Sequence, residues 1–176
     1  RARPKSVQGE SSTTDQLYRN NGDQTFTNVS TQAGILIEGF GLGVQVCDLN
    51  NDNWPDIYVS NDFITNDLLY INNQDGTFSN RAGQYFKHET YNAMGNDIAD
   101  INNDKFLDII TLDMLPENNL RRKTVSGAGA TYFTYINNVE YGYEFQYMRN
   151  MLHLSNGDGS FSEVGQMAGI HQTEWS

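Results

Sequence analysis

Two nine-residue segments of the chain carry oxygen-bearing side chains in the same order. The segments are DLNNDNWPD at 48–56 and DINNDKFLD at 100–108, and both fit the pattern D-x-N-x-D-x-x-x-D. Three carboxylates crowded into one short loop repel one another unless a cation lies between them. A hard divalent ion removes this repulsion, and Ca²⁺ accepts many oxygen ligands in a flexible shell. The pattern therefore predicts two calcium sites.

Each predicted site takes its ligands from positions 1, 3, 5, 7 and 9 of its loop. Positions 1, 3, 5 and 9 offer side-chain oxygens, and position 7 offers a backbone carbonyl. The predicted ligands are Asp48, Asn50, Asp52, Trp54 and Asp56 in the first loop and Asp100, Asn102, Asp104, Phe106 and Asp108 in the second. We expect the calcium to have a structural role, fixing the loop between two strands.

Other kinds of site fit these loops less well. Mg²⁺ prefers a stricter octahedron and retains more water. Zinc prefers Cys and His ligands, but the chain has one Cys and three His, and the histidines are widely separated in the sequence. An EF-hand requires Glu at position 12, where these loops have Val59 and Thr111. Asp and Asn clusters also form metal-free solvated turns, but two matching copies favour the calcium interpretation.

Longer repeats surround the two loops. A segment that begins at Leu17 recurs from Leu69 and from Leu152, offsets of 52 and 83 residues, and each copy runs through Asn, Asp and Thr or Ser to Phe. The segment 42–52 recurs at 94–104 with the same offset of 52 residues. Two elements that share one offset indicate an internal repeat of about fifty residues. The second copy carries 31 extra residues, the difference between 83 and 52.

Short apolar runs bounded by Asn, Asp and Gly predict β-strands joined by tight turns, and helical periodicity is hard to find. The NGDGTF-type segments predict hairpin turns. Four short strands in a unit of about fifty residues are typical of a β-propeller blade. We therefore predict an all-β fold: about three blades of a partial propeller, with calcium-binding loops and one long insertion.

The predicted divisions of the chain follow the repeats. They are a polar N-terminal segment at 1–15, a first repeat at 16–66, a second repeat at 67–149 with an insertion at about 114–149, and the start of a third repeat at 150–176. Closed propellers usually contain four to eight blades. We therefore expect this chain to be part of a longer propeller.

The residues around the two loops resemble a known family. GFGLG at 39–43 and DIYV at 56–59, with the loops themselves, are similar to FG-GAP/VCBS repeats, the blades of integrin-α-like propellers. NDFITNDLLYINN, LDMLPENNLRRK and QYMRNMLHLSNGDGSFSEVGQMAGI resemble bacterial VCBS-repeat proteins with an ASPIC/UnbV region. The resemblance extends from Gln16 to Ser176 and implies calcium loops and a secreted or outer-membrane surface location.

Position 6 of each loop departs from that family, which usually has Gly there. The residues are Asn53 in the first loop and Lys105 in the second. Asn tolerates the left-handed conformation, whereas it costs Lys about 1 kcal/mol or more. We therefore expect the second site to bind calcium more weakly or to adopt a shifted turn.

The insertion is rich in aromatic residues and begins with a basic triplet, Arg121 to Lys123. The aromatic residues are Tyr132, Phe133, Tyr135, Tyr141, Tyr143, Phe145 and Tyr147. Such rings can form a sugar- or peptide-binding platform, because Tyr offers rigid area plus a hydroxyl. The alternative, which we favour, is that they pack the insertion onto the face of the propeller.

Charge and composition restrict the partners. With 11 Lys+Arg against 22 Asp+Glu, the formal charge is −11, which opposes binding to nucleic acid. No apolar run approaches the ~20 residues that span a bilayer, so we expect no direct membrane insertion. We expect an extracellular protein or a glycan as the partner, within a larger cell-surface assembly.

No set of residues typical of catalysis stands out beside the two loops. Asp62, Asp67, Asp113 and Glu117 follow predicted strands and have the chemistry to act in a groove, but turn or cap roles are favoured. The leading hypothesis is a calcium-stabilised extracellular β-propeller module for binding or scaffolding, without enzymatic activity. The alternatives are a non-catalytic part of a polysaccharide-active lyase or hydrolase and a protein-adhesion propeller.

Overall fold

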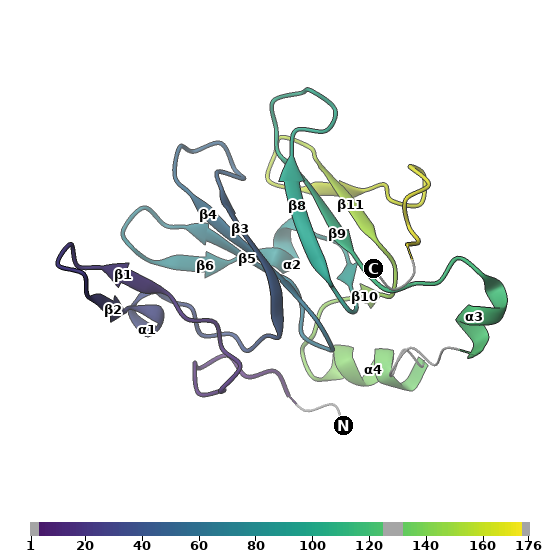
Figure 1. Ribbon diagram of the computed structural model, residues 1–176, viewed down its shortest axis with the longest axis horizontal. Coiled ribbons are helices and arrows are strands. Elements are labelled where there is room, and N and C mark those ends of the chain that lie inside the picture. Colours follow the sequence, from purple (N-terminus) through teal and green to yellow (C-terminus); the bar gives the residue numbers. More distant parts are fainter. Residues whose placement is uncertain (1–3, 125–131, 174–176) are drawn as a thin grey trace.

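The computed structural model describes residues 4–124 and 132–173, which fold mainly as β-strands (Figure 1). Within these residues, two four-stranded antiparallel sheets lie side by side, with strand orders β3-β4-β5-β6 and β12-β11-β9-β8. The first sheet consists of β3 (Gly41–Cys47), β4 (Asp56–Asn61), β5 (Leu68–Asn72) and β6 (Phe78–Asn80). The second consists of β8 (Gly95–Ala99), β9 (Asp108–Leu112), β11 (Met151–Ser155) and β12 (Phe161–Glu163).

Smaller elements flank the two sheets. An antiparallel hairpin precedes the first sheet, and a short parallel pair joins the insertion to the segment between the sheets. The strands of these pairs are β1 (Tyr18–Asn20) with β2 (Phe26–Asn28) and β7 (Glu89–Thr90) with β10 (Gln146–Tyr147). The helices are α1 (Ser30–Ala33), α2 (Ala82–Tyr85), α3 (Asn119–Thr124) and α4 (Tyr132–Glu140).

The three repeated segments form the same hairpin turn. They join β1 to β2, β5 to β6 and β11 to β12, and all three pairs are antiparallel. In each turn, the backbone N–H of Thr or Ser donates to Oδ1 of the Asp two residues earlier: Thr25 to Asp23, Thr77 to Asp75 and Ser160 to Asp158. This local bond stabilises the turn without any contact from elsewhere in the chain. The prediction of hairpin turns is therefore confirmed.

The two central strands of the first sheet, β4 and β5, are buried on both faces. Tyr58 and Leu69 point into a core shared with the second sheet and with the segment that joins the two sheets. Val59, Leu68 and Tyr70 point into a second core on the opposite face. Successive residues of a strand face opposite sides, so adjacent residues such as Tyr58 and Val59 enter different cores. This double burial fixes β4, the strand that follows the first loop, whereas one face of β3 is exposed.

The two sheets meet through the edge strands β3 and β8, which face each other (Figure 1). A Cβ atom on Gly43 would lie 2.6 Å from the side-chain nitrogen of Asn96, so the close approach requires glycine. Asn96 Nδ2 donates to Ser60 Oγ at 2.7 Å, and the Tyr58 and Thr111 hydroxyls lie 3.0 Å apart. The sheets are thus joined by side chains, without strand pairing between them.

The insertion predicted at 114–149 lies between β9 and β11, and part of it is helical. Helices were not expected, and that prediction is wrong for this region. The residues of α4, YFTYINNVE, are mostly aromatic, β-branched or Asn, which are mediocre helix formers. The helices α1 and α2 have only four residues each, too few for a periodic pattern to show. Within residues 4–124 and 132–173, no helix has the length and apolar character to cross a membrane.

Candidate functional site

The two carboxylate loops occupy equivalent places in the two sheets. The first loop joins β3 to β4, directly after the pair Cys47 and Asp56. The second joins β8 to β9, directly after the pair Ala99 and Asp108. Each loop therefore connects the edge strand that faces the neighbouring sheet to the next strand of its own sheet, as the repeat predicts.

The first loop is organised by hydrogen bonds from its own backbone. The Asp52 N–H donates to Asp48 Oδ1 and to Asn50 Oδ1, both at 3.0 Å, which brings these two oxygens together. The Asn53 N–H donates to Asp48 Oδ2 at 2.8 Å, and the Trp54 N–H donates to Asp52 Oδ1 at 2.8 Å. The side-chain oxygens at positions 1, 3 and 5 therefore all accept backbone N–H groups of residues 52–54.

The second loop repeats this pattern bond for bond. The Asp104 N–H donates to Asp100 Oδ1 and to Asn102 Oδ1 at 3.0 Å. The Lys105 N–H donates to Asp100 Oδ2 at 2.9 Å, and the Phe106 N–H donates to Asp104 Oδ1 at 2.8 Å. Two loops with different residues at four positions thus adopt one turn.

The left-handed residues also match between the loops. Position 4 is Asn51 with φ 59° and Asn103 with φ 60°, and position 6 is Asn53 with φ 68° and Lys105 with φ 76°. The turn of the second loop is therefore not shifted, and Lys105 adopts the left-handed conformation, which is unfavourable for Lys. Of the two expectations for this loop, only weaker binding stays a prediction.

Position 9 ties each loop to the third strand of its sheet. Asp56 and Asp108 are fully buried. Each carboxylate accepts one N–H from position 2 of its own loop and one from the third strand: Leu49 and Asn72 for Asp56, Ile101 and Ser155 for Asp108. Burial raises the pKa of Asp56, while the N–H groups of Asn72 and Leu49 oppose that rise.

The donor set suits calcium in its chemistry, because all the predicted side-chain ligands are hard oxygens. Within the described residues, however, no three Asp, Glu, His or Cys side chains come close enough together to form a metal-ligand group. The oxygens of positions 1 and 3 accept the position-5 N–H, and the position-5 carboxylate accepts the position-7 N–H. Position 9 instead accepts N–H groups from position 2 and from the third strand. Calcium binding by the ten named residues stays a prediction.

A set of buried carboxylates lies between the two sheets. The Asp67 carboxylate accepts the Tyr58 hydroxyl at 2.6 Å and the Asn61 N–H at 2.8 Å, and burial raises its pKa to about 7. Glu89 accepts the Asp67 N–H at 3.0 Å, and burial and then the Asp67 charge raise its pKa well above the ordinary value. Burial also raises the pKa of Asp113 to about 6.

These acids are bound to backbone and neighbouring side chains and do not face an open groove. Asp67, Glu89 and Asp113 are each only 1% exposed, while Asp62 is half-buried and Glu117 is exposed. The sequence pointed to Asp67 and Asp113 as turn or cap residues, and both do accept backbone N–H groups. Glu89 belongs to no sequence motif, and the sequence did not predict a role for it.

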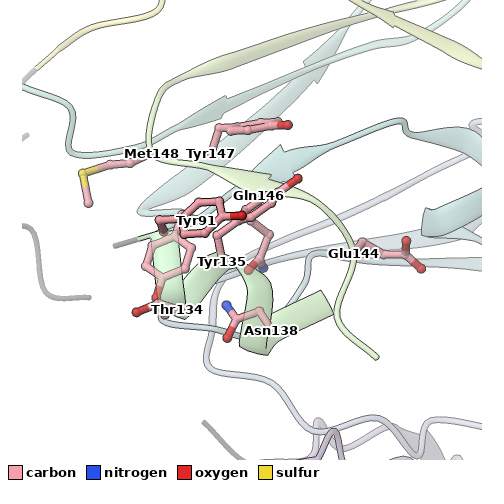
Figure 2. Close-up of a pocket in the computed structure, with 9 residues that line it drawn as sticks. Tyr91, Thr134, Tyr135, Asn138, Glu144, Gln146, Tyr147 and Met148 are labelled. Carbon is pink, nitrogen blue, oxygen red and sulfur yellow. The ribbon is translucent and has the colours of Figure 1, made fainter. Parts of the chain in front are cut away.

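A cavity of about 360 Å³ lies beside α4, and three of the aromatic residues of the insertion, Tyr132, Tyr135 and Tyr147, are among its lining (Figure 2). Tyr135 and Tyr147 line it, with ring centroids 6.2 Å apart and planes inclined by 26°. Of the seven aromatic residues, only Tyr143 is buried, and five are exposed: Tyr132, Phe133, Tyr141, Phe145 and Tyr147. The expectation that these rings pack the insertion onto the sheets is therefore wrong for the five exposed rings, whereas Tyr143 is buried with Lys5 Nζ over its ring.

Three buried residues of this cavity are among those that the sequence-based prediction did not single out. They are Tyr91, Asn138 and Gln146, all buried and all lining it. Tyr91 follows β7, Asn138 belongs to α4 and Gln146 to β10, so only the fold brings them together. A single Asn or Gln in a sequence rich in both carries no signal of its own.

A comparison with known protein families matches the part of the chain that contains both loops. The family model described as an FG-GAP-like repeat matches residues 7–59 and 48–111, two overlapping stretches that together contain both loops. Among curated proteins, none matches this chain. The matched stretches extend from residue 7 to residue 111 of 176, which is more than half of the chain. The chain belongs to the FG-GAP-like repeat family.

Proposed function

We propose that this chain is a calcium-stabilised, propeller-type module that acts outside the cell in binding or scaffolding. The observation that carries the proposal is the identity of the two loops, which have the same hydrogen bonds and the same left-handed positions in equivalent hairpins. Because both loops bring side-chain oxygens together in the same way, we expect them to bind the same kind of ligand. A hard divalent cation is the ligand that fits oxygen donors.

Charge supports a cation at both loops. Asp48, Asp52 and Asp56, with their three counterparts in the second loop, supply six acidic groups to a chain whose formal charge is −11. Two Ca²⁺ ions, each carrying +2, bring that charge to −7. Binding relieves the repulsion among neighbouring carboxylates and fixes the hairpin that they belong to.

The test is thermal unfolding with and without a chelator. With free Ca²⁺ at 100 times its Kd, one site adds about 2.7 kcal/mol to the free energy of unfolding. We expect EDTA to lower the melting temperature and excess Ca²⁺ to restore it. A double variant, Asp52→Ala with Asp104→Ala, is expected to melt at the same temperature with and without EDTA. An unchanged melt of the natural chain, with no calcium by elemental analysis, contradicts the proposal.

The propeller architecture, the surface location and the finer resemblance to bacterial VCBS-repeat proteins are parts of this same proposal. Two adjacent four-stranded antiparallel sheets and the FG-GAP-like match support the propeller architecture and the extracellular module. The finer VCBS resemblance rests on the sequence segments alone. An extracellular protein or a glycan is the proposed partner. A glycan array followed by product analysis tests the glycan partner: intact bound glycans support a binding module, whereas shortened products favour the polysaccharide-active alternative. Pull-down from the native cell surface tests the protein partner.

A further inference from the structure

The cavity beside α4 has the size and lining of a small-ligand site. Its volume of about 360 Å³ falls within the ~300–1,000 Å³ of such sites, which are mostly apolar with a few placed polar groups. Figure 2 shows that its lining comes from α4, from the chain around β10 and from Tyr91. The Tyr147 ring lines the cavity and is 42% exposed, so it offers an accessible aromatic surface.

Two buried amide oxygens in the lining lack a hydrogen-bond donor. Asn138 is 3% exposed and Gln146 is 6% exposed, and neither Asn138 Oδ1 nor Gln146 Oε1 has a partner in the described part of the chain. Gln146 Nε2 donates to the carbonyl oxygen of Thr65 at 3.0 Å, which orients the amide group. A buried acceptor without a donor is unfavourable. A ligand that carries hydroxyl groups supplies the missing donors.

The charges around the cavity favour a neutral ligand. Among the described residues the lining contains no Lys or Arg, and the carboxylate of its acidic residue, Glu144, points away from the rings toward Gly83 (Figure 2). Arg149 lies next to Tyr147, but its Nη2 is paired with Glu163 at 2.8 Å. A phosphate or a uronic acid would therefore find no cation among the described residues that line the cavity. A neutral sugar needs none.

We propose that this cavity binds a neutral sugar unit of a glycan. A pyranose ring has an apolar C–H face, which packs against an aromatic ring, and O–H donors around its edge. Tyr135 and Tyr147 supply the aromatic surfaces, while Asn138 and Gln146 supply the acceptors. The proposal rests on the binding role proposed above and specifies its partner, but it uses none of the predicted calcium ligands.

The experiment is isothermal titration calorimetry of the full chain, in calcium, with a panel of oligosaccharides. The neutral probes are cellohexaose, mannohexaose, xylohexaose and maltohexaose, and the acidic probe is tetragalacturonate. We expect at least one neutral probe to bind. We expect Tyr147→Ala to weaken that binding by at least tenfold, and Tyr135→Ala to weaken it similarly.

Phe133→Ala is the matched control. Phe133 lies in α4, as Tyr135 does, but it is 77% exposed and does not line the cavity. We therefore expect its truncation to leave the Kd for the sugar within twofold. Failure of every neutral probe to bind, an unchanged Kd in Tyr147→Ala, or tighter binding of tetragalacturonate overturns the proposal. If Tyr147→Ala does not fold, saturation-transfer NMR on the natural chain decides, because transfer from tyrosine ring protons to the bound sugar is required.

The same samples separate this proposal from the calcium role. Sugar binding with a melt that ignores EDTA upholds the cavity and contradicts the calcium proposal. A melt that responds to EDTA with no sugar binding does the reverse. Binding to the cavity and stabilisation of the loops are therefore judged by independent measurements.

Discussion

The loops at 48–56 and 100–108 share a backbone turn but differ in their surroundings. Leu49, at position 2 of the first loop, is 5% exposed and belongs to the core between the sheets. Ile101, at the same position of the second loop, is 48% exposed. In the first loop, Gln74 Nε2 also donates to Asp52 Oδ2 at 3.2 Å. Position 9 ties both loops to buried strands, but only the first loop is also anchored in the core at position 2.

This difference separates two sources of structure. The turn depends on Asp, Asn and backbone N–H groups within nine residues, so the two loops form it alike. The anchoring depends on what packs against position 2, and the neighbouring sheet supplies that packing only for the first loop. Equal motifs therefore need not have equal stability or equal affinity for a metal.

Truncation at position 2 tests the comparison most strongly. Leu49→Ala removes a buried side chain, and we expect it to lower the free energy of unfolding by about 2–5 kcal/mol. Ile101→Ala removes a half-exposed one, and we expect a change of about 0.5 kcal/mol or less. Denaturant unfolding of both variants in calcium measures the difference. Equal losses contradict the unequal anchoring of the loops.

Calcium titration tests whether the loops differ in affinity. We expect two sites, of which Asp52→Ala removes the tighter and Asp104→Ala the weaker. At a free Ca²⁺ concentration of 100 times the tighter Kd, the tighter site contributes about 2.7 kcal/mol. The weaker site contributes about 1 kcal/mol less, because Lys105 holds the left-handed conformation there. Calorimetric titration of the two variants gives both constants, and a tighter second site reverses the comparison.

Replacement at position 6 identifies the cause of any such difference. Lys105→Gly removes the left-handed strain, and we expect a gain of about 1 kcal/mol in the free energy of unfolding, with tighter calcium binding. Asn53→Gly is the matched change in the first loop, where we expect a smaller gain because Asn tolerates this conformation.

Lys105→Gln separates strain from charge. It removes the positive charge near the carboxylates but keeps a side chain that disfavours positive φ. If Lys105→Gln improves calcium affinity as much as Lys105→Gly does, then charge and not strain weakens the second site. The measurement is the same titration on the three variants.

The smallest expected effect concerns the side-chain bond peculiar to the first loop. Gln74→Ala removes the donor to Asp52, and because this bond is exposed we expect a loss of about 0.5 kcal/mol or less. Thermal unfolding in calcium measures it. A larger loss would mean that Gln74, and not Leu49, is the main anchor of this loop.

Much of the fold follows from residues that are close in the sequence. The hairpin turns depend on Asp and a Thr or Ser two residues later, and the strands depend on short apolar runs between such turns. The first sheet takes β3 and β4 from the predicted first repeat and β5 and β6 from the predicted second repeat. The helix α4 escaped prediction because its aromatic and β-branched residues have no clear helical preference and tertiary context decides their state.

The sequence by itself determined the repeats, the turns, the position and bonding of the two loops, and the family. Tertiary structure alone decided that Leu49 is buried and Ile101 exposed, that Glu89 lies beside Asp67, and that Tyr91 joins Asn138 in one cavity. The reason is physical: a turn is fixed by bonds between neighbours in the chain, whereas burial depends on which distant segments pack together. Short motifs encode turns and carry little information about burial.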